Sequence, residues 1–296
     1  MKKKILDVNV DFGFTIDTAV EAVANLFDTK GSHLIATTSP YFIMRAQQDK
    51  EFKRILNESS YSMPDGVGVL QAEAFLKEAS NIKRGVMFYP KVILAGLKVG
   101  FIQSFKKNGI GEIITGIELS EKLLKYAAEN GKSVLLLGGR PRDKKGNFED
   151  GNYDMAADAA EVLRKKYPTI NIIGATSQFD RNAKDDTKTG SYIRKLLKSH
   201  NISTIDLILI AYGPVFQEKW FARNKSSIPM KVGIGIGRKF DYLTGYMPEP
   251  NKIYKTLHIE WLYSLFIQPW RFKRIFMSFP LFPVKVMLQF IKTHKI

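Results

Sequence analysis

The sequence contains no cysteine, and this absence excludes several kinds of chemistry. Without thiols the chain cannot form a disulfide framework, use a cysteine nucleophile or bind zinc through thiolates. No nucleophile motif of a Ser-His-Asp hydrolase is present. The histidines are few, scattered and without metal-ligand spacing: His33, His200, His258 and His294. We therefore expect no metal site and no cofactor.

Long hydrophobic runs are also missing. A membrane-spanning helix needs roughly 20 consecutive apolar residues. The closest candidate, Ser278–Ile291, contains two prolines and a lysine. The start, Met1–Lys4, resembles the basic region of a signal peptide, but polar residues from Asp7 onward leave no apolar region after it. We expect a chain that stays inside the cell, with Ser278–Ile291 lying on a bilayer rather than crossing it.

Acidic residues are few relative to basic ones. The chain has 29 Asp and Glu against 45 Lys and Arg, a formal net charge of +16. This excess favours an anionic partner, whether nucleic acid, a phosphate-bearing substrate or acidic lipid. It is concentrated in two segments. Lys83–Lys107 carries basic residues and no acid, and Asn251–Ile296 combines basic and aromatic residues with a single acid, Glu260.

What is present is enough apolar residues for a full core, 45% of 296. Helical and strand patterns alternate, which predicts an α/β fold: a Rossmann-like, mostly parallel sheet with covering helices. The predicted strands are His33–Thr37, Val134–Leu137, Ile170–Gly174, Ile205–Ala211 and Lys231–Gly237. The predicted helices are one starting at Asp17, then Tyr41–Leu56, Ser120–Asn130, Met155–Tyr167 and Ser191–Ser199.

Two domains are expected. The first is an α/β domain over residues 1–250, with a basic insertion around residues 78–108. The second is a basic, aromatic C-terminal appendage over residues 251–296, which we expect to associate with a membrane because interleaved rings and cations suit a lipid interface. Two other interpretations of the appendage stay open. The rings could stack on nucleic-acid bases, or the segment could be an ordinary packed helix.

One carboxylate stands between a proline and two glycines in Met63–Val69, which reads MPDGVGV. Proline fixes φ and glycine permits positive φ, so Asp65 is expected at a sharp turn rather than on a helix face. A turn or a helix N-cap is the ordinary role of an aspartate before glycine. A catalytic role is the alternative.

Glycine-rich segments follow two of the predicted strands. Gly138-Gly139-Arg140 could cradle a diphosphate with exposed amides and a cation. Gln217-Glu218 opens a helix after the strand Ile205–Ala211, where an acid in the first turn is also favoured by the helix dipole alone. Ligands of open parallel sheets collect at the carboxyl ends of strands, so these segments are expected to share one crevice with Thr37 and Asp65.

Two further patterns are set aside. The alternating glycines of Gly233–Gly237 do not match a dinucleotide fingerprint, so a nicotinamide site is rejected. The acidic pair Asp185-Asp186 is read as a solvated loop, because it lies in a hydrophilic stretch.

Several short motifs occur in order along the chain. They are Thr37–Pro40, Pro64–Gly68, Leu136–Gly139, Gln217–Trp220, Gly235–Gly237 with Phe240, Asp241 and Gly245, Glu260–Tyr263, and Pro269–Arg271 with Arg274. Each is modest alone. The ordered set, from about Ile5 to Arg274, resembles the WecG/TagA/CpsF glycosyltransferases, glycosyltransferase family 26.

The resemblance implies an inverting glycosyltransferase without an essential metal. Its donor would be a UDP-linked N-acetylhexosamine of the N-acetylmannosamine type. Its acceptor would be a polyprenyl-diphosphate-linked sugar, in the synthesis of cell-surface polysaccharide or teichoic acid. The protein would be peripheral, on the cytoplasmic face of the cell membrane, with no nucleic-acid partner. Homo-oligomers stay open.

The motifs also imply residue roles. Asp65 matches the general base, and Thr37 is the second expected catalytic residue. Arg271 and Arg274 match C-terminal arginines that hold diphosphate. The expected substrate-binding set is Ser39, Gly66, Gly138, Gly139, Arg140, Gln217, Glu218, Gly237, Asp241, Arg271 and Arg274.

This sequence departs from the family pattern at several points. Ser39 replaces the asparagine of T-x-N-P, Pro214 is displaced, and Ile113–Glu118 replaces R-V-x-G-x-D. Ser264 replaces a basic residue, and Pro248–Pro250 replaces R-A-P. Two alternatives to an active transferase follow. One is a catalytically lapsed protein that only binds lipid-linked sugar, and the other is a basic nucleic-acid-binding protein.

Overall fold

The computed structural model describes residues 1–102, 112–140, 153–247 and 269–293. Its centre is a six-stranded sheet in the order β4-β3-β8-β7-β5-β6, and every neighbouring pair is parallel. This confirms the predicted α/β class. The strands are β3 (His33–Thr38), β4 (Tyr61–Pro64), β5 (Ser133–Gly138), β6 (Asn171–Thr176), β7 (Ile205–Ala211) and β8 (Met230–Gly235).

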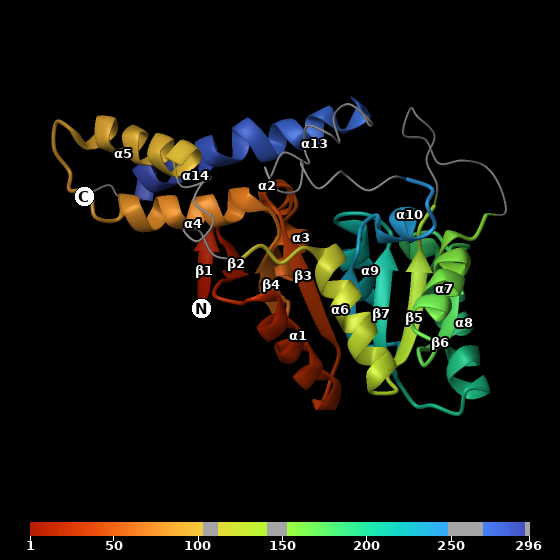
Figure 1. Ribbon diagram of the computed structural model, residues 1–296. Coiled ribbons are helices and arrows are strands. Elements are labelled where there is room, and N and C mark those ends of the chain that lie inside the picture. The colour runs from red at the N-terminus through yellow and green to blue at the C-terminus, as the bar shows by residue number, and fades with distance from the viewer. Residues whose placement is uncertain (103–111, 141–152, 248–268, 294–296) are drawn as a thin grey trace.

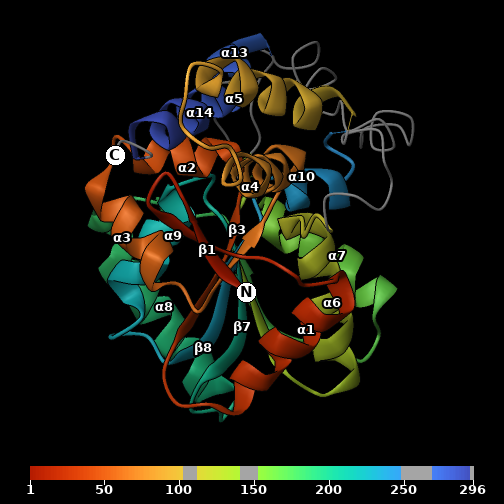
Figure 2. The same ribbon diagram turned by 90° about the vertical axis from the view of Figure 1, so that its left-hand side faces the viewer.

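Helices cover both faces of the sheet (Figure 2). One face packs against α1 (Ile16–Ala24), α6 (Gly116–Glu129) and α7 (Met155–Lys166). The other packs against α3 (Lys50–Glu58), α8 (Asp186–Ser199) and α9 (Phe216–Asn224). Strands buried on both faces read as unbroken apolar runs, which is why β5 and β7 were visible in the sequence.

Some sequence expectations are corrected. The helix predicted over Tyr41–Leu56 is two helices, α2 (Pro40–Ala46) and α3. Asp49 ends the run, because its carboxylate accepts the Phe52 amide at 3.0 Å and starts a new helix. The short β4 and the hairpin of β1 (Lys2–Ile5) with β2 (Val8–Asp11) were not predicted, because four residues are too few for a period to show.

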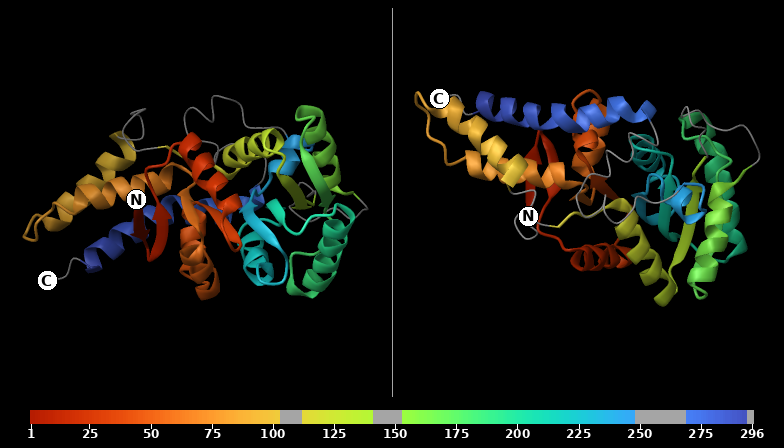
Figure 3. Two further views of the ribbon diagram at one scale, coloured as in Figure 1. Left: turned by 90° about the horizontal axis from the view of Figure 1, so that it is seen from below. Right: turned by 45° about the horizontal axis from the view of Figure 1, so that its top comes forward.

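A third layer of helices lies beyond the carboxyl ends of the strands (Figure 1). It contains α4 (Val67–Ala79), α5 (Phe88–Leu97), α13 (Phe272–Phe276) and α14 (Phe282–Thr293). Three π- or 3₁₀-helical turns continue these helices: Lys98–Ile102, Pro269–Arg271 and Met277–Leu281. Figure 3 shows α5 and α14 running side by side on the part of the molecule that projects away from the sheet.

The C-terminal helices pack on the α/β domain through one apolar cluster. Phe282, Val286 and Phe290 are buried in it with side chains of α2, α4 and α5. The predicted domain boundary at residue 250 falls outside the described residues. The division into two domains therefore stays a prediction.

One segment is longer and more apolar than the sequence suggested. Phe272–Thr293 is helical over 22 residues and, by length and composition alone, is sufficient to cross a membrane. This differs from the expectation of no such segment, because helix continues on both sides of Pro280 despite extended backbone at Phe279. Such a helix is weak evidence of crossing by itself.

Candidate functional site

The carboxyl ends of the strands meet at one edge of the sheet, where two groups of expected site residues lie. From β3 the chain moves outward to β4, and from β5 it moves outward to β6, with β7 and β8 between them. Open α/β sheets bind ligands at such a reversal of strand order. Figure 1 shows this edge beneath α13 and beside α10 (Lys239–Leu243).

The turn after β4 holds Asp65. Its amide donates to the Thr38 carbonyl at 3.1 Å, which ties the turn to β3. Gly66 adopts φ +98°, a conformation that residues with a Cβ rarely adopt. A Cβ on Gly68 would lie 2.9 Å from Pro40 Cγ, so the two motifs pack directly on each other. These contacts fix Asp65 at the sheet edge.

The environment of Asp65 separates the two roles considered for it. The N-cap residue of α4 is Gly66, so Asp65 is not the N-cap of that helix but lies in the turn before it. The aspartate is half-buried, not enclosed in the core. A carboxylate held at the surface of this edge is placed to meet a ligand.

Thr37 lies beside Asp65 on the neighbouring strand. It is buried near the end of β3 and pairs in register with Met63. A Cβ on Gly116 would lie 2.9 Å from Thr37 Oγ1 and 3.2 Å from the Gly235 carbonyl oxygen. Ser39 has a structural function: its side chain accepts from the Phe42 amide as the N-cap of α2. Serine performs this capping as well as asparagine does.

Gln217 and Glu218 lie at the start of α9, next to β8. They are 3% and 1% exposed. Glu218 Oε2 accepts the Val215 amide at 2.8 Å, and Oε1 accepts Gln217 Nε2 at 2.7 Å. A Cβ on Gly235 would come 2.1 Å from Gln217 Nε2, so glycine is required there. Glu218 therefore closes the first turn of its helix. This is the purely structural role that the sequence also allowed.

Burial gives Glu218 unusual acid–base properties. Removal from water disfavours its charged form and raises its pKa to about 7, and hydrogen bonds from Gln217 and Val215 oppose that rise only in part. Gln217 Oε1 is buried and has no hydrogen-bond partner among the described residues. Val215 has φ +75°, which is strained for a β-branched residue. Orphaned polar atoms and local strain are both common at functional sites.

Arginines from the C-terminal helices lie over this edge. The Arg274 guanidinium lies 5.0 Å from the centre of the Tyr41 ring. Burial lowers the pKa of Arg274, the charge of Arg238 lowers it further, and Asp65 and Glu218 act in the opposite direction. Burial and the nearby charges of Arg274 and Arg238 also hold the pKa of Arg271 well below its usual value. Three guanidinium groups gathered in this way favour an anionic ligand.

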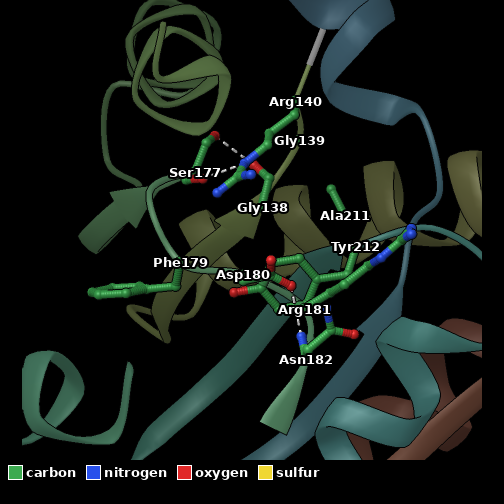
Figure 4. Close-up of a pocket in the computed structure, with 10 residues that line it drawn as sticks. All are labelled: Gly138, Gly139, Arg140, Ser177, Phe179, Asp180, Arg181, Asn182, Ala211 and Tyr212. Carbon is green, nitrogen blue, oxygen red and sulfur yellow. Dashed lines mark hydrogen bonds between the residues drawn. The ribbon is translucent and has the colours of Figure 1, made fainter. Parts of the chain in front are cut away.

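The second group forms a cavity of about 140 Å³ over β5, β6 and β7, which we call the glycine cavity (Figure 4). Gly138 and Gly139 adopt φ +84° and +86°. A Cβ on Gly138 would lie 2.7 Å from the Tyr212 ring, so a larger residue would not fit. Other lining residues include two cations, one carboxylate and two hydroxyl-bearing residues: Arg140, Arg181, Asp180, Ser177 and Tyr212.

Polar groups converge on the glycine cavity. The Arg140 guanidinium donates to the Ser177 and Gln178 carbonyls at 3.3 and 3.4 Å. Arg181 lies 3.7 Å above the Phe216 ring, and burial lowers its pKa. The Tyr212 hydroxyl is buried and has no hydrogen-bond partner in the described part of the chain. An unpartnered hydroxyl and two cations suit a phosphorylated ligand.

The remaining expected residues among those described are Gly237 and Asp241, which follow β8 in the chain. Gly237 (φ +58°) turns the chain from β8 into α10. Asp241 lies on α10 close enough to Tyr153 to help raise the pKa of that phenol, after a hydrogen bond to Asp158 and burial. The motif Glu260–Tyr263 and the departures at Pro248–Pro250 and Ser264 lie outside the described residues.

Sequence reasoning missed several residues at this edge. Arg181 and Tyr212 follow predicted strands, so the rule that ligands meet strand ends could have found them. Arg238 was noticed only as a cation, and Tyr41 only as part of a helix. The solvated-loop reading is wrong for Asp186, which begins α8 and binds Arg223 (Nε to Oδ2, 2.7 Å). Among the described residues, no cluster of three or more histidine, aspartate or glutamate side chains suits a metal ion.

Comparison with known proteins identifies the family. The pattern of the Glycosyl transferase WecG/TagA/CpsF family matches residues 3–93 and 91–296, nearly the whole chain. The chain belongs to this family. The resemblance drawn from the sequence motifs is thereby confirmed, and so is the expectation of a glycosyltransferase.

Individual relatives are more distant. A protein of Bacillus subtilis (strain 168) is 23% identical over 260 residues, covering 88% of this chain and 81% of its own. A protein of Staphylococcus aureus (strain MRSA252) is 24% identical over 287 residues, covering 96% and 92%. Both are named N-acetylglucosaminyldiphosphoundecaprenol N-acetyl-beta-D-mannosaminyltransferase. Their names describe a lipid-linked acceptor and a mannosamine-type donor sugar.

Proposed function

We propose that this protein transfers an N-acetylmannosamine-type sugar from UDP to a polyprenyl-diphosphate-linked sugar, with inversion at the anomeric carbon. Family membership and the names of the relatives support the reaction class and the acceptor. The observation that carries the proposal is the placement of Asp65, half-buried at the carboxyl edge of the sheet and within electrostatic reach of Arg274. The protein would work at the inner face of the cell membrane.

Asp65 is the better candidate for the base. In an inverting transfer the acceptor hydroxyl loses a proton as it attacks the anomeric carbon from the face opposite the departing UDP. Glu218 is the other carboxylate nearby, but it is 1% exposed and both of its oxygens already accept hydrogen bonds. Asp65 stands on a turn at the edge, where a hydroxyl can approach its carboxylate. Thr37, buried near the end of the neighbouring strand β3, is the second proposed catalytic residue.

Cations and amides would stabilise the leaving diphosphate. Negative charge grows on the UDP oxygen as the glycosidic bond breaks, and preorganised cations lower the energy of that charge. Arg271 and Arg274 lie at the edge on the C-terminal helices, and we propose that they hold diphosphate without a metal. The glycine cavity, with Gly138, Gly139 and Arg140, is the proposed site for the donor nucleotide.

Gln217 and Glu218 would support the reaction without accepting the proton. The Gln217 Oε1 atom is buried without a protein partner among the described residues, so a substrate hydroxyl is a suitable donor to it. Glu218 holds the Gln217 amide in place through the 2.7 Å hydrogen bond. In this proposal Gln217 binds sugar and Glu218 positions Gln217.

The test is the variant Asp65→Asn. Loss of the proton acceptor should lower turnover by roughly 10² to 10⁴, the usual contribution of a general base. The measurement is UDP release from a panel of UDP-sugars with a short-chain polyprenyl-diphosphate-sugar acceptor. Asp17→Asn is a matched control, because Asp17 is an exposed acid on α1 that pairs with Lys122. Near-normal turnover of Asp65→Asn would remove Asp65 from the base role.

The same assay tests the lapsed-enzyme alternative. A chain that only binds lipid-linked sugar would release no UDP with any donor while still binding the acceptor. The capping geometry of Ser39 shows that this departure from the family is accommodated in the fold. A gel-shift assay at matched salt tests the nucleic-acid alternative, for which we expect no specific complex.

A further inference from the structure

We propose that α5 and the helices α13–α14 together form one docking surface for an anionic lipid bilayer, here called the platform. The new element is α5, which lies in the basic insertion and to which the proposed reaction gives no role. The inference rests on the proposed function for the lipid-linked acceptor. The surface itself is argued from exposure, packing and charge.

Helix α5 is apolar on two faces. Phe88, Val92 and Ala95 are buried and face the protein. The opposite face is also apolar and is uncovered, with Leu94 65% and Val86, just before the helix, 96% exposed. The exposed apolar residues of this segment are Val86, Met87, Tyr89, Ile93, Leu94 and Leu97. Soluble surface helices normally carry polar residues on the outer face, so this helix needs a partner.

The C-terminal helices repeat this pattern. Phe282, Val286 and Phe290 are buried at intervals of four residues. Other apolar side chains face away from the protein, and only 17% of the most apolar stretch of Phe272–Thr293 is buried. The large apolar residues that are exposed are Phe272, Phe276, Phe279, Val284 and Leu288. Aromatic side chains of this kind suit the boundary between lipid headgroups and acyl chains.

Specific contacts join the two halves into one surface. The Phe88 and Phe290 rings stack with centroids 6.4 Å apart, and Phe75 of α4 meets Phe290 edge-on at 5.8 Å. Arg84 Nη2 donates to the Ile291 carbonyl at 2.8 Å. Figures 1 and 3 show α5 and α14 side by side. Their outward apolar residues therefore belong to one platform.

The positive charge of the platform favours an anionic bilayer over a second copy of this chain. Residues 80–102 and 269–293 contain no aspartate or glutamate. The cations of these segments outside the proposed active site are Lys83, Arg84, Lys91, Lys273, Lys285 and Lys292, together with Lys98, which pairs with Glu78 of α4. A second copy of this chain docking on the same surface would bring these cations against each other. Acidic headgroups would instead neutralise them, at about 1 kcal/mol for each cation near the surface.

The position of the platform suits the reaction. In Figure 1 the platform lies on the side toward which β5 and β7 point. Arg274 on α13 contacts the Tyr41 ring and lies within electrostatic reach of Asp65. A bilayer on the platform would thus present a lipid-linked diphosphate close to the proposed base.

The experiment compares the parent with Ile93→Gln/Leu94→Gln/Leu97→Gln, which keeps the buried face of α5. Sedimentation is measured with phosphatidylcholine vesicles, with and without phosphatidylglycerol. The expected result is a loss of about tenfold or more in partition to the anionic vesicles, because three apolar side chains no longer enter the interface. Ile117→Gln, an exposed isoleucine on α6, is the control and should sediment like the parent.

A second variant tests the proposal if the first one does not fold. Lys83→Gln/Lys91→Gln keeps every apolar contact and should reduce the preference for phosphatidylglycerol vesicles. Circular dichroism checks both folds. Parent-like sedimentation of both folded variants, or a parent that ignores anionic vesicles, would overturn the proposal. A parent dimer in light scattering that the α5 variant breaks would also overturn it, in favour of a subunit interface.

Turnover separates this proposal from the proposed function. The α5 variant should retain UDP release with a water-soluble, short-chain acceptor and lose it with a long-chain acceptor embedded in vesicles. Equal loss with both acceptors would contradict a docking role. No UDP release by the parent with any donor would refute the transferase proposal and leave the vesicle result standing by itself.

Discussion

Two carboxylates, Asp65 and Glu218, stand at the same sheet edge in opposite environments. Asp65 is half-buried on the turn before Gly66, so it is partly exposed to solvent. Glu218 is enclosed, and its oxygens are held by the Val215 amide and Gln217. Residue type alone would make either one a base. Because Asp65 is the more exposed of the two, we propose proton transfer for Asp65 and positioning for Glu218.

The enclosure of Glu218 predicts a pH dependence of stability. Its pKa rises from 4.5 to about 7 on folding, so the native state binds a proton more tightly than the unfolded state. The free energy of unfolding should then fall as pH rises from 4.5 to about 7, and the contribution of Glu218 should be constant outside this window. In Glu218→Gln the fall should be smaller by about 3 kcal/mol.

Urea unfolding of parent and Glu218→Gln at several pH values measures this difference. The two stability curves should converge toward low pH and separate as pH rises. Parallel curves would show that Glu218 is charged in the native state throughout. Asp17→Asn again serves as the control, because Asp17 is an exposed acid on α1.

At the scale of helices and strands, the site is assembled from elements that meet only at their ends. Helices α2 and α4 begin beside each other, and Pro40 of one packs on Gly68 of the other. The Asp65 amide joins β4 to β3 through the Thr38 carbonyl. These contacts explain why the two short motifs, far apart in the sequence, belong to one structural unit.

This contact predicts the effect of Gly68→Ala. The added Cβ would lie 2.9 Å from Pro40 Cγ, so α2 and α4 must move apart. Overpacking should cost about 1–3 kcal/mol of stability. The displaced Asp65 turn should lower turnover by roughly tenfold to a hundredfold, as small misplacements of catalytic groups do.

Gly96→Ala is the matched control for this helix substitution. Its Cβ would meet Phe75 at 3.9 Å, an ordinary contact, so alanine should be neutral or add up to about 1 kcal/mol through helix propensity. Urea unfolding and turnover with the short-chain acceptor are the measurements. Wild-type turnover of Gly68→Ala would mean that the turn does not depend on this contact.

At the scale of the whole molecule, charge and apolar surface are separated from the sheet. The net charge of +16 is concentrated in the insertion and the C-terminal segment, and both contribute to the platform. Arg84 and Ile291 are 207 residues apart in the sequence, yet they are hydrogen-bonded. The fold thus brings two basic segments together on one side of the molecule, the proposed platform.

The platform predicts salt-dependent membrane binding. Headgroup attraction is screened by salt, since the Debye length falls from about 10 Å at 0.1 M to about 3 Å at 1 M. Partition of the parent to phosphatidylglycerol vesicles should fall about tenfold or more over this range. Some binding should remain at high salt, because the insertion of apolar side chains is not screened. Vesicle sedimentation at increasing sodium chloride measures it. Salt-independent binding would mean that the cations make no contact with lipid.

The sequence alone was sufficient for the α/β class, the longer strands, the family and the position of Asp65 on a turn. These depend on local signals: continuous apolar runs for buried strands, and φ limits of proline and glycine for the turn. The same local signals misjudged Asp186, merged α2 with α3, and gave α5 no role beyond that of an insertion.

Only the tertiary structure decided which separated residues meet. Arg181 and Tyr212 enter the glycine cavity because the sheet order brings β6, β5 and β7 together. The sequence predicted a membrane role for the C-terminal segment but none for α5, and only packing shows which apolar faces of α5 and α14 are exposed. Strand order and helix packing are set by long-range burial, which no short window of residues contains.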